Sequence, residues 1–342
     1  MHALITGAAG FIGQKLASRL SARGDTVTGL DIVPMNAHSF PGTFVRGDVR
    51  DKRAIQKAIV GCETVFHLAA AHHDFGIDES TYRGVNVEGT KLLCDVMSEC
   101  EIRQLCFYSS VAAFGDTPEP RTEDAAARPA SAYGQSKLDA EQVIHSWWSN
   151  AQGRRALIIR PTLTFGPMNF GNMYSLINQI YRGLYLQVGK GENIKSICYV
   201  ENLLDATLFL WDSQSLAEFD CFNYVDKPDL CSRRLSELIG AALGRKRAGM
   251  TVPLGLALVM CWPFDLVNKV FGLNTKISTA RVRKFAVERT VFDAAKVRAA
   301  GFSPKMELAE AISVTVKWFL EEGRKTKPVS RPAPKEIYLP AG

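Results

Sequence analysis

A glycine-rich turn near the N-terminus is the feature that most restricts the fold of this chain. Thr6-Gly-Ala-Ala-Gly-Phe-Ile-Gly13 follows the apolar run Ala3–Ile5 and leads into an amphipathic stretch. This order predicts a strand, a tight turn and a helix, the context that a dinucleotide-binding loop requires. We expect Gly7 to permit the turn, Gly10 to let the backbone approach a pyrophosphate, and Gly13 to let the helix pack closely. The free N–H groups of the helix N-terminus would then face the phosphates.

Strand and helix patterns alternate from Met1 to about Arg160, which predicts an α/β fold with a Rossmann-type, doubly wound parallel sheet. Further strands are expected at Thr26–Leu30, Phe44–Val45, Thr64–Leu68, Leu105–Ser109 and Ala156–Ile159, and the clearest later helices at Val85–Glu101 and Ala132–Trp148. Asp51 is expected to cap the helix that follows the third strand.

The pattern changes after Pro161, where turn-rich segments interrupt helical stretches such as Met173–Tyr181 and Leu203–Trp211. We therefore assign residues 1–165 to the nucleotide-binding domain, whose sheet later segments complete. Residues 166–322 are mainly a smaller, mixed substrate-binding part. Residues 323–342 form a basic, proline-containing tail that we expect to be flexible.

Composition limits the partners and the compartment. The formal net charge of +6 over 342 residues is modest, and no basic stripe interleaved with aromatic residues is present, so we expect no nucleic-acid partner. The eight cysteines form no C-x-x-C pair and indicate buried thiols in a reducing compartment. Because the glycine turn begins within a few residues of Met1, we expect no secretory signal and a cytoplasmic location.

One segment stands apart, since Met250–Phe264 contains no charged residue. It is shorter than the roughly 20 apolar residues that span a bilayer, and it contains two prolines. A buried helix of the smaller part is the first interpretation. A helix that lies on a membrane surface is the alternative, favoured by the flanking Arg245–Arg247 and Lys269.

Two carboxylates are expected to contact the cofactor. Asp31 ends the second strand, a little over twenty residues after the glycine turn, where a carboxylate accepts the adenosine ribose hydroxyls and repels a 2′-phosphate. Ile32-Val33-Pro34 offers no arginine for that phosphate, so NAD is favoured over NADP. Asp48 follows the third strand and either accepts from the adenine amino group or starts the next helix.

Three residues are the candidate catalytic set. Tyr133 and Lys137 are four residues apart and therefore share one face of a helix. An ammonium one turn away favours the phenolate that Tyr133 needs in order to act as a base, and Lys137 can also hold the nicotinamide ribose. Ser110 closes the fifth strand, where its hydroxyl can polarise a substrate oxygen.

The histidines suggest a metal site at first sight. No carboxylate or cysteine is spaced to complete a ligand set with His67, His72 and His73, so we expect no metal and interpret these side chains as active-site lining.

These motifs together resemble the extended short-chain dehydrogenase/reductases, in their sugar-nucleotide epimerase/dehydratase branch, over nearly the whole chain up to about Leu320. In that family a serine, a tyrosine and a lysine have the roles given above, and the nicotinamide takes hydride from a sugar carbon. A homodimer is common there. The resemblance further implies cofactor contacts from Phe11, Ile12, Val49, Leu68, Ala69, Ala70, Asn86 and Pro161.

A narrower resemblance appears in the second half, in Gly171–Tyr174, Val188–Asn202 and Phe222–Asp229. These segments are similar to bacterial 4-epimerases that act on N-acetylglucosaminyl-diphospho-undecaprenol. The resemblance implies a diphosphate-linked sugar as substrate, with Asn172, Lys195 and Arg283 as contacts. Related nucleotide-sugar epimerases often have an arginine where this chain has Lys195.

Four alternatives for function follow. A dehydratase usually has an Asp-Glu pair after the serine, whereas Val111-Ala112-Ala113 follows Ser110, so dehydration is disfavoured. Epimerisation at C4 and a net oxidation or reduction, for example of a 4-keto sugar or a 3β-hydroxysteroid, need the same residues. Measurement of NADH separates these two, because an epimerase accumulates none, whereas a net oxidation or reduction changes the redox state of the cofactor. A scaffold without activity is disfavoured by the intact Ser110, Tyr133 and Lys137.

Overall fold

The computed structural model describes residues 1–35, 39–72, 77–115, 121–213, 216–271, 279, 282 and 289–326. A seven-stranded sheet, in the order β11-β6-β5-β4-β1-β2-β3, forms the larger lobe, and every strand pair in it is parallel. The strands are β1 (His2–Thr6), β2 (Thr26–Asp31), β3 (Thr43–Arg46), β4 (Thr64–His67), β5 (Gln104–Tyr108), β6 (Arg155–Pro161) and β11 (Phe219–Tyr224). The expected doubly wound sheet is thus confirmed.

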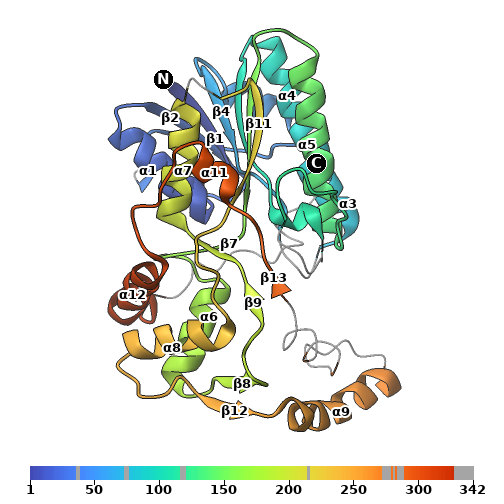
Figure 1. Cartoon of the computed structure of the whole chain (residues 1–342). Helices are drawn as coiled ribbons and strands as arrows, with labels where there is room; N and C mark the ends of the chain where they lie inside the picture. Colours follow the sequence, from blue (N-terminus) through green and yellow to red (C-terminus); the bar gives the residue numbers. More distant parts are fainter. Residues whose placement is uncertain are drawn as a thin grey trace.

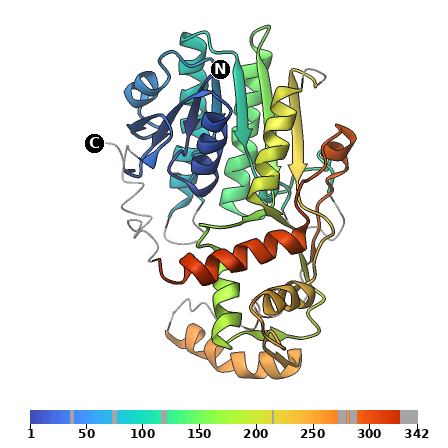
Figure 2. The same cartoon turned by 90° about the vertical axis from the view of Figure 1, so that its left-hand side faces the viewer.

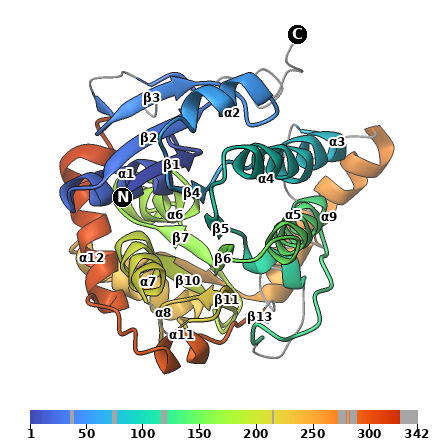
Figure 3. The same cartoon turned by 90° about the horizontal axis from the view of Figure 1, so that it is seen from above.

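Helices cover both faces of this sheet, as the view from above shows (Figure 3). One face carries α2 (Lys52–Ala58), α4 (Gly89–Glu99) and α5 (Ala132–Ser149), and the other carries α1 (Phe11–Ala22) and α7 (Val200–Asp212). Short elements complete the lobe: α3 (Glu79–Tyr82), the π-helical turn η2 (Arg83–Glu88), the 3-10 turn η3 (Val111–Phe114) and α11 (Ala295–Ala299).

Strand alternation divides the buried apolar residues into two cores. Leu4 of β1 packs in the core under α2, α4 and α5, whereas its neighbours Ala3 and Ile5 pack in the core that includes α1 and α7. Successive side chains of a strand point to opposite faces, so both faces of β1 must be apolar. This explains the continuous apolar run before the glycine turn.

The smaller lobe lies below the sheet (Figure 1). It contains β8 (Leu186–Val188), β9 (Ile194–Lys195), β12 (Met250–Val252), β13 (Arg289–Thr290), α6 (Asn172–Arg182), α8 (Ser232–Ala242) and α9 (Leu254–Phe271). Parallel pairs join β8 to β12 and β9 to β13. The pair β7 (Leu163–Phe165) and β10 (Ile197–Tyr199) links the lobes, and α12 (Leu308–Trp318), followed by the π-helical turn η4 (Phe319–Gly323), crosses between them (Figure 2).

Most element predictions hold, and one detail differs. As expected, the chain returns to the sheet after Pro161, because β11 pairs with β6. The helix expected over Val85–Glu101 instead begins at Glu79 and contains the π-helical turn η2.

The interpretation of Met250–Phe264 as a buried segment is wrong. Its helical part, the start of α9, exposes 70% of Val259 and 63% of Trp262. Among the described residues, no helix is long and apolar enough to cross a membrane.

Candidate active site

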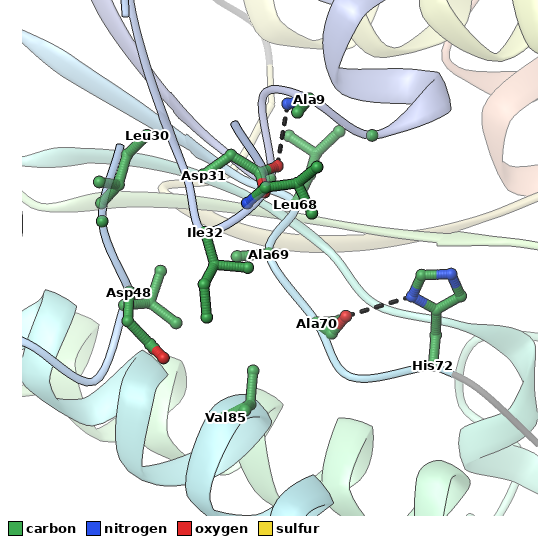
Figure 4. A pocket seen from close by; sticks show the side chains of 15 residues that line it. Ala9, Leu30, Asp31, Ile32, Asp48, Leu68, Ala69, Ala70, His72 and Val85 are labelled. Carbon is green, nitrogen blue, oxygen red and sulfur yellow. Dashed lines mark hydrogen bonds between the residues drawn. The ribbon is translucent and has the colours of Figure 1, made fainter. Parts of the chain in front are cut away.

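An open pocket lies at the carboxyl edge of the sheet, where the strand order reverses between β1 and β4. Parallel sheets bind their ligands at this point. The loops that follow β1, β2, β3 and β4 all contribute to it (Figure 4). The lining residues are Gly7, Ala9, Gly10, Leu30, Asp31, Ile32, Val33, Gly47, Asp48, Val49, Leu68, Ala69, Ala70, His72 and Val85.

Gly7 fixes the shape of the first loop. Its φ of +72° lies in the left-handed region, and a Cβ on it would lie 2.7 Å from the amide nitrogen of Ala69. Only glycine combines this turn with so close an approach of two loops. The N-terminus of α1 then opens towards the pocket at Gly10. The local geometry is that expected of a pyrophosphate-binding turn.

Asp31 is held at the pocket by the backbone. Its carboxylate accepts hydrogen bonds from the N–H of Ala9 at 2.9 Å and of Val33 at 2.8 Å (Figure 4). The lining described above includes no Lys or Arg. The described part of the pocket therefore offers a carboxylate acceptor and no lining cation for a 2′-phosphate, which fits NAD rather than NADP.

Asp48 also lines the pocket, and it does not cap the next helix. Its carboxylate accepts from the backbone N–H of Arg50 at 2.8 Å and forms an ion pair with the guanidinium of Arg50 at 2.5 Å. Asp51 caps α2 instead, by accepting from the N–H of Arg53 at 2.9 Å. The alternative in which Asp48 starts the helix is thereby removed, and the adenine contact stays a prediction.

Ser110 and Tyr133 come from segments that pack directly together. Ser110 caps the N-terminus of η3, where its hydroxyl accepts from the N–H of Ala112 at 3.1 Å, and Tyr133 is in the first turn of α5. A Cβ on Gly134 would lie 2.3 Å from the carbonyl oxygen of Ala112, so a larger residue would separate α5 from η3. The glycine after Tyr133 therefore lets the two candidate groups approach each other.

Lys137 is one helical turn after Tyr133 in α5 and is fully buried. Its ammonium donates to the carbonyl oxygen of Tyr108 at 2.6 Å and lies 4.2 Å from the centre of the Phe107 ring. Burial lowers the pKa of Lys137 to about 7, opposed by the negative charge of Glu141. The side chain is thus fixed between the end of β5 and α5.

A buried network that the sequence analysis missed fixes the segment before Ser110. Ser109 donates to the carboxylate of Glu141 on α5, and the same carboxylate accepts from Arg160 of β6 at 2.6 and 2.9 Å. The ion pair strongly raises the pKa of the guanidinium of Arg160, although its burial opposes this. Glu141 is four residues after Lys137 and therefore shares its helix face. This spacing was the only feature of the sequence that pointed to the buried network.

The histidine interpretation needs one correction. His72 lines the pocket as expected, and its Nδ1 is 3.2 Å from the carbonyl oxygen of Ala70. His67 does not line it, because its fully buried ring lies between the hydroxyls of Thr6 at 2.6 Å and Thr90 at 2.9 Å. Burial lowers the pKa of His67 to about 3, with a contribution from the charge of Lys137.

His73 lies outside the described residues. Among the described residues, no group of three or more His, Cys, Asp or Glu side chains could hold a metal ion.

Asn86 supports the pocket from behind. It accepts from the N–H of Ala71 at 2.7 Å and donates to the carbonyl of Ala71 at 3.0 Å and to Ser136 at 2.8 Å. These bonds attach the loop after β4 to η2 and α5. All three partners are protein groups, so a contact with the cofactor stays a prediction.

The remaining predicted residues lie away from the lining. Phe11 and Ile12 are in the first turn of α1, behind Gly10, and Pro161 is buried at the end of β6. In the smaller lobe, Asn172 is exposed at the first position of α6 and Lys195 is half-buried in β9. Arg283 lies outside the described residues.

Several lining residues had no role in the sequence analysis, namely Ala9, Leu30, Gly47 and Val85. Leu30 precedes Asp31, and Ala9 lies inside the glycine turn, so adjacency to a motif was an available signal. Val85 is contributed by η2, whose position depends on tertiary packing.

Residues 3–223 match the NAD dependent epimerase/dehydratase family. The N-acetyl-α-D-glucosaminyl-diphospho-ditrans,octacis-undecaprenol 4-epimerase of Escherichia coli O157:H7 is 35% identical over 325 residues, which cover 95% of this chain and 97% of that protein. The UDP-glucose 4-epimerase of Vibrio cholerae is 24% identical, over 94% and 96% of the two chains.

Solved structures share the fold. The UDP-glucuronic acid 4-epimerase from Bacillus cereus in complex with NAD superposes with a TM-score of 0.75 at 19% identity, covering 94% of this chain and 99% of the other. The family match identifies NAD as the cofactor of this chain. The glycine turn, Asp31 and the pocket at the sheet edge agree with this cofactor. The chain belongs to the NAD dependent epimerase/dehydratase family.

Proposed function

We propose that this protein is a sugar 4-epimerase that acts on a diphosphate-linked hexose or N-acetylhexosamine, and that a polyprenyl lipid carries the sugar. The similarity to the undecaprenol-linked epimerase of E. coli O157:H7, 35% identical over 95% of this chain, is the observation that most supports this substrate. The residues after Ser110 support epimerisation over dehydration, because Val111-Ala112-Ala113 contains no acid or base.

When bound, NAD would supply the hydride chemistry, oxidation of the sugar at C4 and its reduction from the opposite face. The residues of this chain would hold the cofactor in place. Asp31 would receive the adenosine ribose, and the turn from Gly7 to Gly10 would receive the pyrophosphate. Lys137 would hold the nicotinamide ribose.

Tyr133 is the proposed acid–base group. It would take the proton of the C4 hydroxyl as the sugar is oxidised and give it back as the sugar is reduced. The buried charge of Lys137, one helical turn away, favours the phenolate form. Ser110, held at the start of η3, would orient and polarise the same oxygen. The Ser109–Glu141–Arg160 network positions Ser110 without touching the substrate.

The substrate contacts belong to this proposal. Asn172 and Lys195 are on the smaller lobe, and we propose that they and Arg283 contact the sugar diphosphate. We also propose the division into a cofactor-binding part, residues 1–165, a substrate-binding part, residues 166–322, and a basic tail, residues 323–342. A homodimer with a cytoplasmic, peripheral membrane location would complete the description.

A net oxidation or reduction is the second candidate. A 3β-hydroxysteroid dehydrogenase/decarboxylase of Arabidopsis thaliana is 26% identical over 81% of this chain. Such an enzyme would use the same three residues with an exchangeable cofactor.

Product analysis separates the two candidates. The purified protein is incubated with N-acetylglucosaminyl-diphospho-polyprenol, with UDP-N-acetylglucosamine, or with a 3β-hydroxysteroid. The hexosamine is then released by mild acid and its epimers are separated by chromatography, with NADH measured in parallel. We expect the galacto epimer from the lipid-linked sugar and no accumulation of NADH. Conversion of the steroid with stoichiometric NADH would overturn the proposal.

A further inference from the structure

The exposed face of α9 is entirely apolar in its first three turns. Leu256, Val259, Met260 and Trp262 are 53%, 70%, 58% and 63% exposed, whereas Ala257 on the opposite side is 7% exposed. Because a helix turns every 3.6 residues, positions 256, 259 and 260 share one face and 262 flanks it. A surface helix normally directs polar residues outward, so this face requires a partner.

The apolar surface extends beyond the helix. Leu184 and Leu186, before and in β8, are 66% and 51% exposed, and Met250 of β12, which pairs with Leu186, is 70% exposed. Seven of the eleven exposed large hydrophobic side chains in the described part of the chain thus lie in β8, β12 and α9 or, for Leu184, two residues before β8. These elements form the end of the smaller lobe farthest from the sheet (Figures 1 and 2). Scattered exposed hydrophobics need no explanation, but a concentration of this kind indicates an interaction surface.

A basic cavity of about 600 Å³ adjoins this surface. Its lining includes five cationic side chains and two carboxylates: Lys190, Arg233, Arg245, Lys246, Arg247, Glu192 and Glu237. Glu237 is also 3.6 Å from Arg234, which is not part of the lining. Gly189, Gly249 and Thr251 also line the cavity, and a Cβ on Gly189 would lie 3.9 Å from the Cβ of Leu254, the first residue of α9. Positive charge and apolar surface therefore meet at one edge.

We propose that this end of the smaller lobe docks on an anionic phospholipid bilayer, with α9 in the plane of the interface and the basic cavity facing the lipid phosphates. Apolar residues with a tryptophan on one side and cations beside them are the composition of a helix that binds a membrane surface. At 18 residues and about 1.5 Å per residue, α9 is too short to span the hydrocarbon core upright.

Charge argues against a second copy of the chain as the occupant. In a two-fold contact the same surface faces itself, so two basic cavities would approach each other. An anionic bilayer satisfies both the charge and the apolar area. This inference deepens the proposed function, because docking would bring the active site to a substrate carried by a membrane lipid. Only this biological reason for docking rests on the proposed function; the docking itself is argued from the exposed surface.

Vesicle sedimentation tests the proposal without any measurement of turnover. The full chain is mixed with vesicles of phosphatidylglycerol and phosphatidylethanolamine, or of phosphatidylcholine alone. We expect most of the protein to sediment with the anionic vesicles and little with the neutral ones. The double variant Val259→Glu/Trp262→Glu should lose this binding, and Lys246→Glu/Arg247→Glu should weaken it about tenfold or more.

Matched controls lie on the larger lobe. Val60 is 72% exposed there, so Val60→Glu adds one carboxylate at a valine as exposed as Val259, and Lys57→Glu reverses one exposed cation. Both should bind vesicles as the wild type does. Retained NAD and unchanged circular dichroism would show that all variants are folded. Vesicle binding, NAD content and circular dichroism do not depend on turnover. The membrane-binding result would therefore stand even if the protein were not an epimerase.

Three results would overturn the proposal. The wild type could fail to bind anionic vesicles, or the α9 double variant could bind them like Val60→Glu. In the third, sedimentation velocity would show a dimer that the α9 variant dissociates, which would make this face a subunit contact.

Discussion

Two regions of this molecule place polar and apolar groups in opposite ways. At the carboxyl edge of the sheet, three charged or polar side chains are buried with protein partners: Lys137 with Tyr108, Glu141 with Arg160, and His67 with two threonines. At the far end of the smaller lobe, apolar side chains of α9 are exposed and cations line an open cavity.

This difference shows which region has its final geometry in the protein alone and which region needs a partner to cover it. Buried polar groups that are fully hydrogen-bonded fix a unique geometry, as a site that positions a cofactor requires. An exposed apolar face gains stability only when something covers it. The cofactor side is therefore preorganised, and the lobe end is adapted to a partner.

The largest expected effect is on the preorganised side. Tyr133→Phe removes the transferable proton and leaves the ring, so turnover should fall by about 10²–10⁴-fold while the bound NAD is retained. Turnover and the NAD content of the purified variant are measured together. A variant with the wild-type rate would remove Tyr133 from the mechanism, and Tyr82→Phe, which alters the neighbouring ring 6.1 Å away, is the matched control.

Acid should weaken the same side through His67. Its pKa is about 3 in the folded protein against 6.5 for the free side chain, so below pH 6.5 the unfolded chain binds a proton that the folded one does not. Stability should then fall by about 1.4 kcal/mol per pH unit between pH 6.5 and about 4.

Chemical denaturation at several pH values measures this slope. The variant His67→Gln, though less stable overall, should show a slope shallower by that amount. An equal slope in the two proteins would show that other groups cause the acid sensitivity.

A smaller effect is expected at Asp31. Asp31→Ala removes the acceptor for the ribose, and the preference for NAD over NADP should fall about tenfold or more, since one hydrogen bond to a charged group contributes about 1.5–3 kcal/mol. Asp31→Asn is the comparison variant, because it removes the charge and keeps one acceptor oxygen, enough for the N–H of Ala9 or for that of Val33 but not for both. Dissociation constants for both cofactors decide the outcome, and an unchanged ratio for Asp31→Ala would assign the ribose to another group.

The smallest effect is expected on α9. Val259→Ser should change the free energy of unfolding by less than about 0.5 kcal/mol, because the side chain is 70% exposed. By contrast, Ile177→Ala in α6 of the same lobe should lower it by about 2–5 kcal/mol, because Ile177 is fully buried. Denaturation without lipid compares the two. A large loss of unfolding free energy for Val259→Ser would mean that other parts of the protein already cover the apolar face of α9 when no lipid is present.

The sequence predicted the sheet and the cofactor loop because both depend on local order. An apolar run, a glycine turn and an aspartate at a set distance place Gly7 and Asp31 at one edge of the sheet whatever the rest of the chain does. The same holds for Tyr133 and Lys137, whose spacing fixes one helix face.

The features that the sequence could not predict depend on tertiary contacts. The pairing of Glu141 with Arg160 requires α5 to cross β6, and the burial of His67 requires two threonines from other elements. On α9, both faces are apolar, so periodicity cannot separate a buried helix from an exposed one. The interpretation of that segment as buried failed for this reason.

The fate of the C4 hydrogen tests the central claim most directly. N-acetylglucosaminyl-diphospho-polyprenol that carries deuterium at C4 is incubated with the purified protein and unlabelled NAD. The account predicts that the galacto epimer keeps the deuterium at C4, since the hydride is returned to the sugar that lost it. Release of the deuterium into free NADH, with a keto sugar as product, would contradict it.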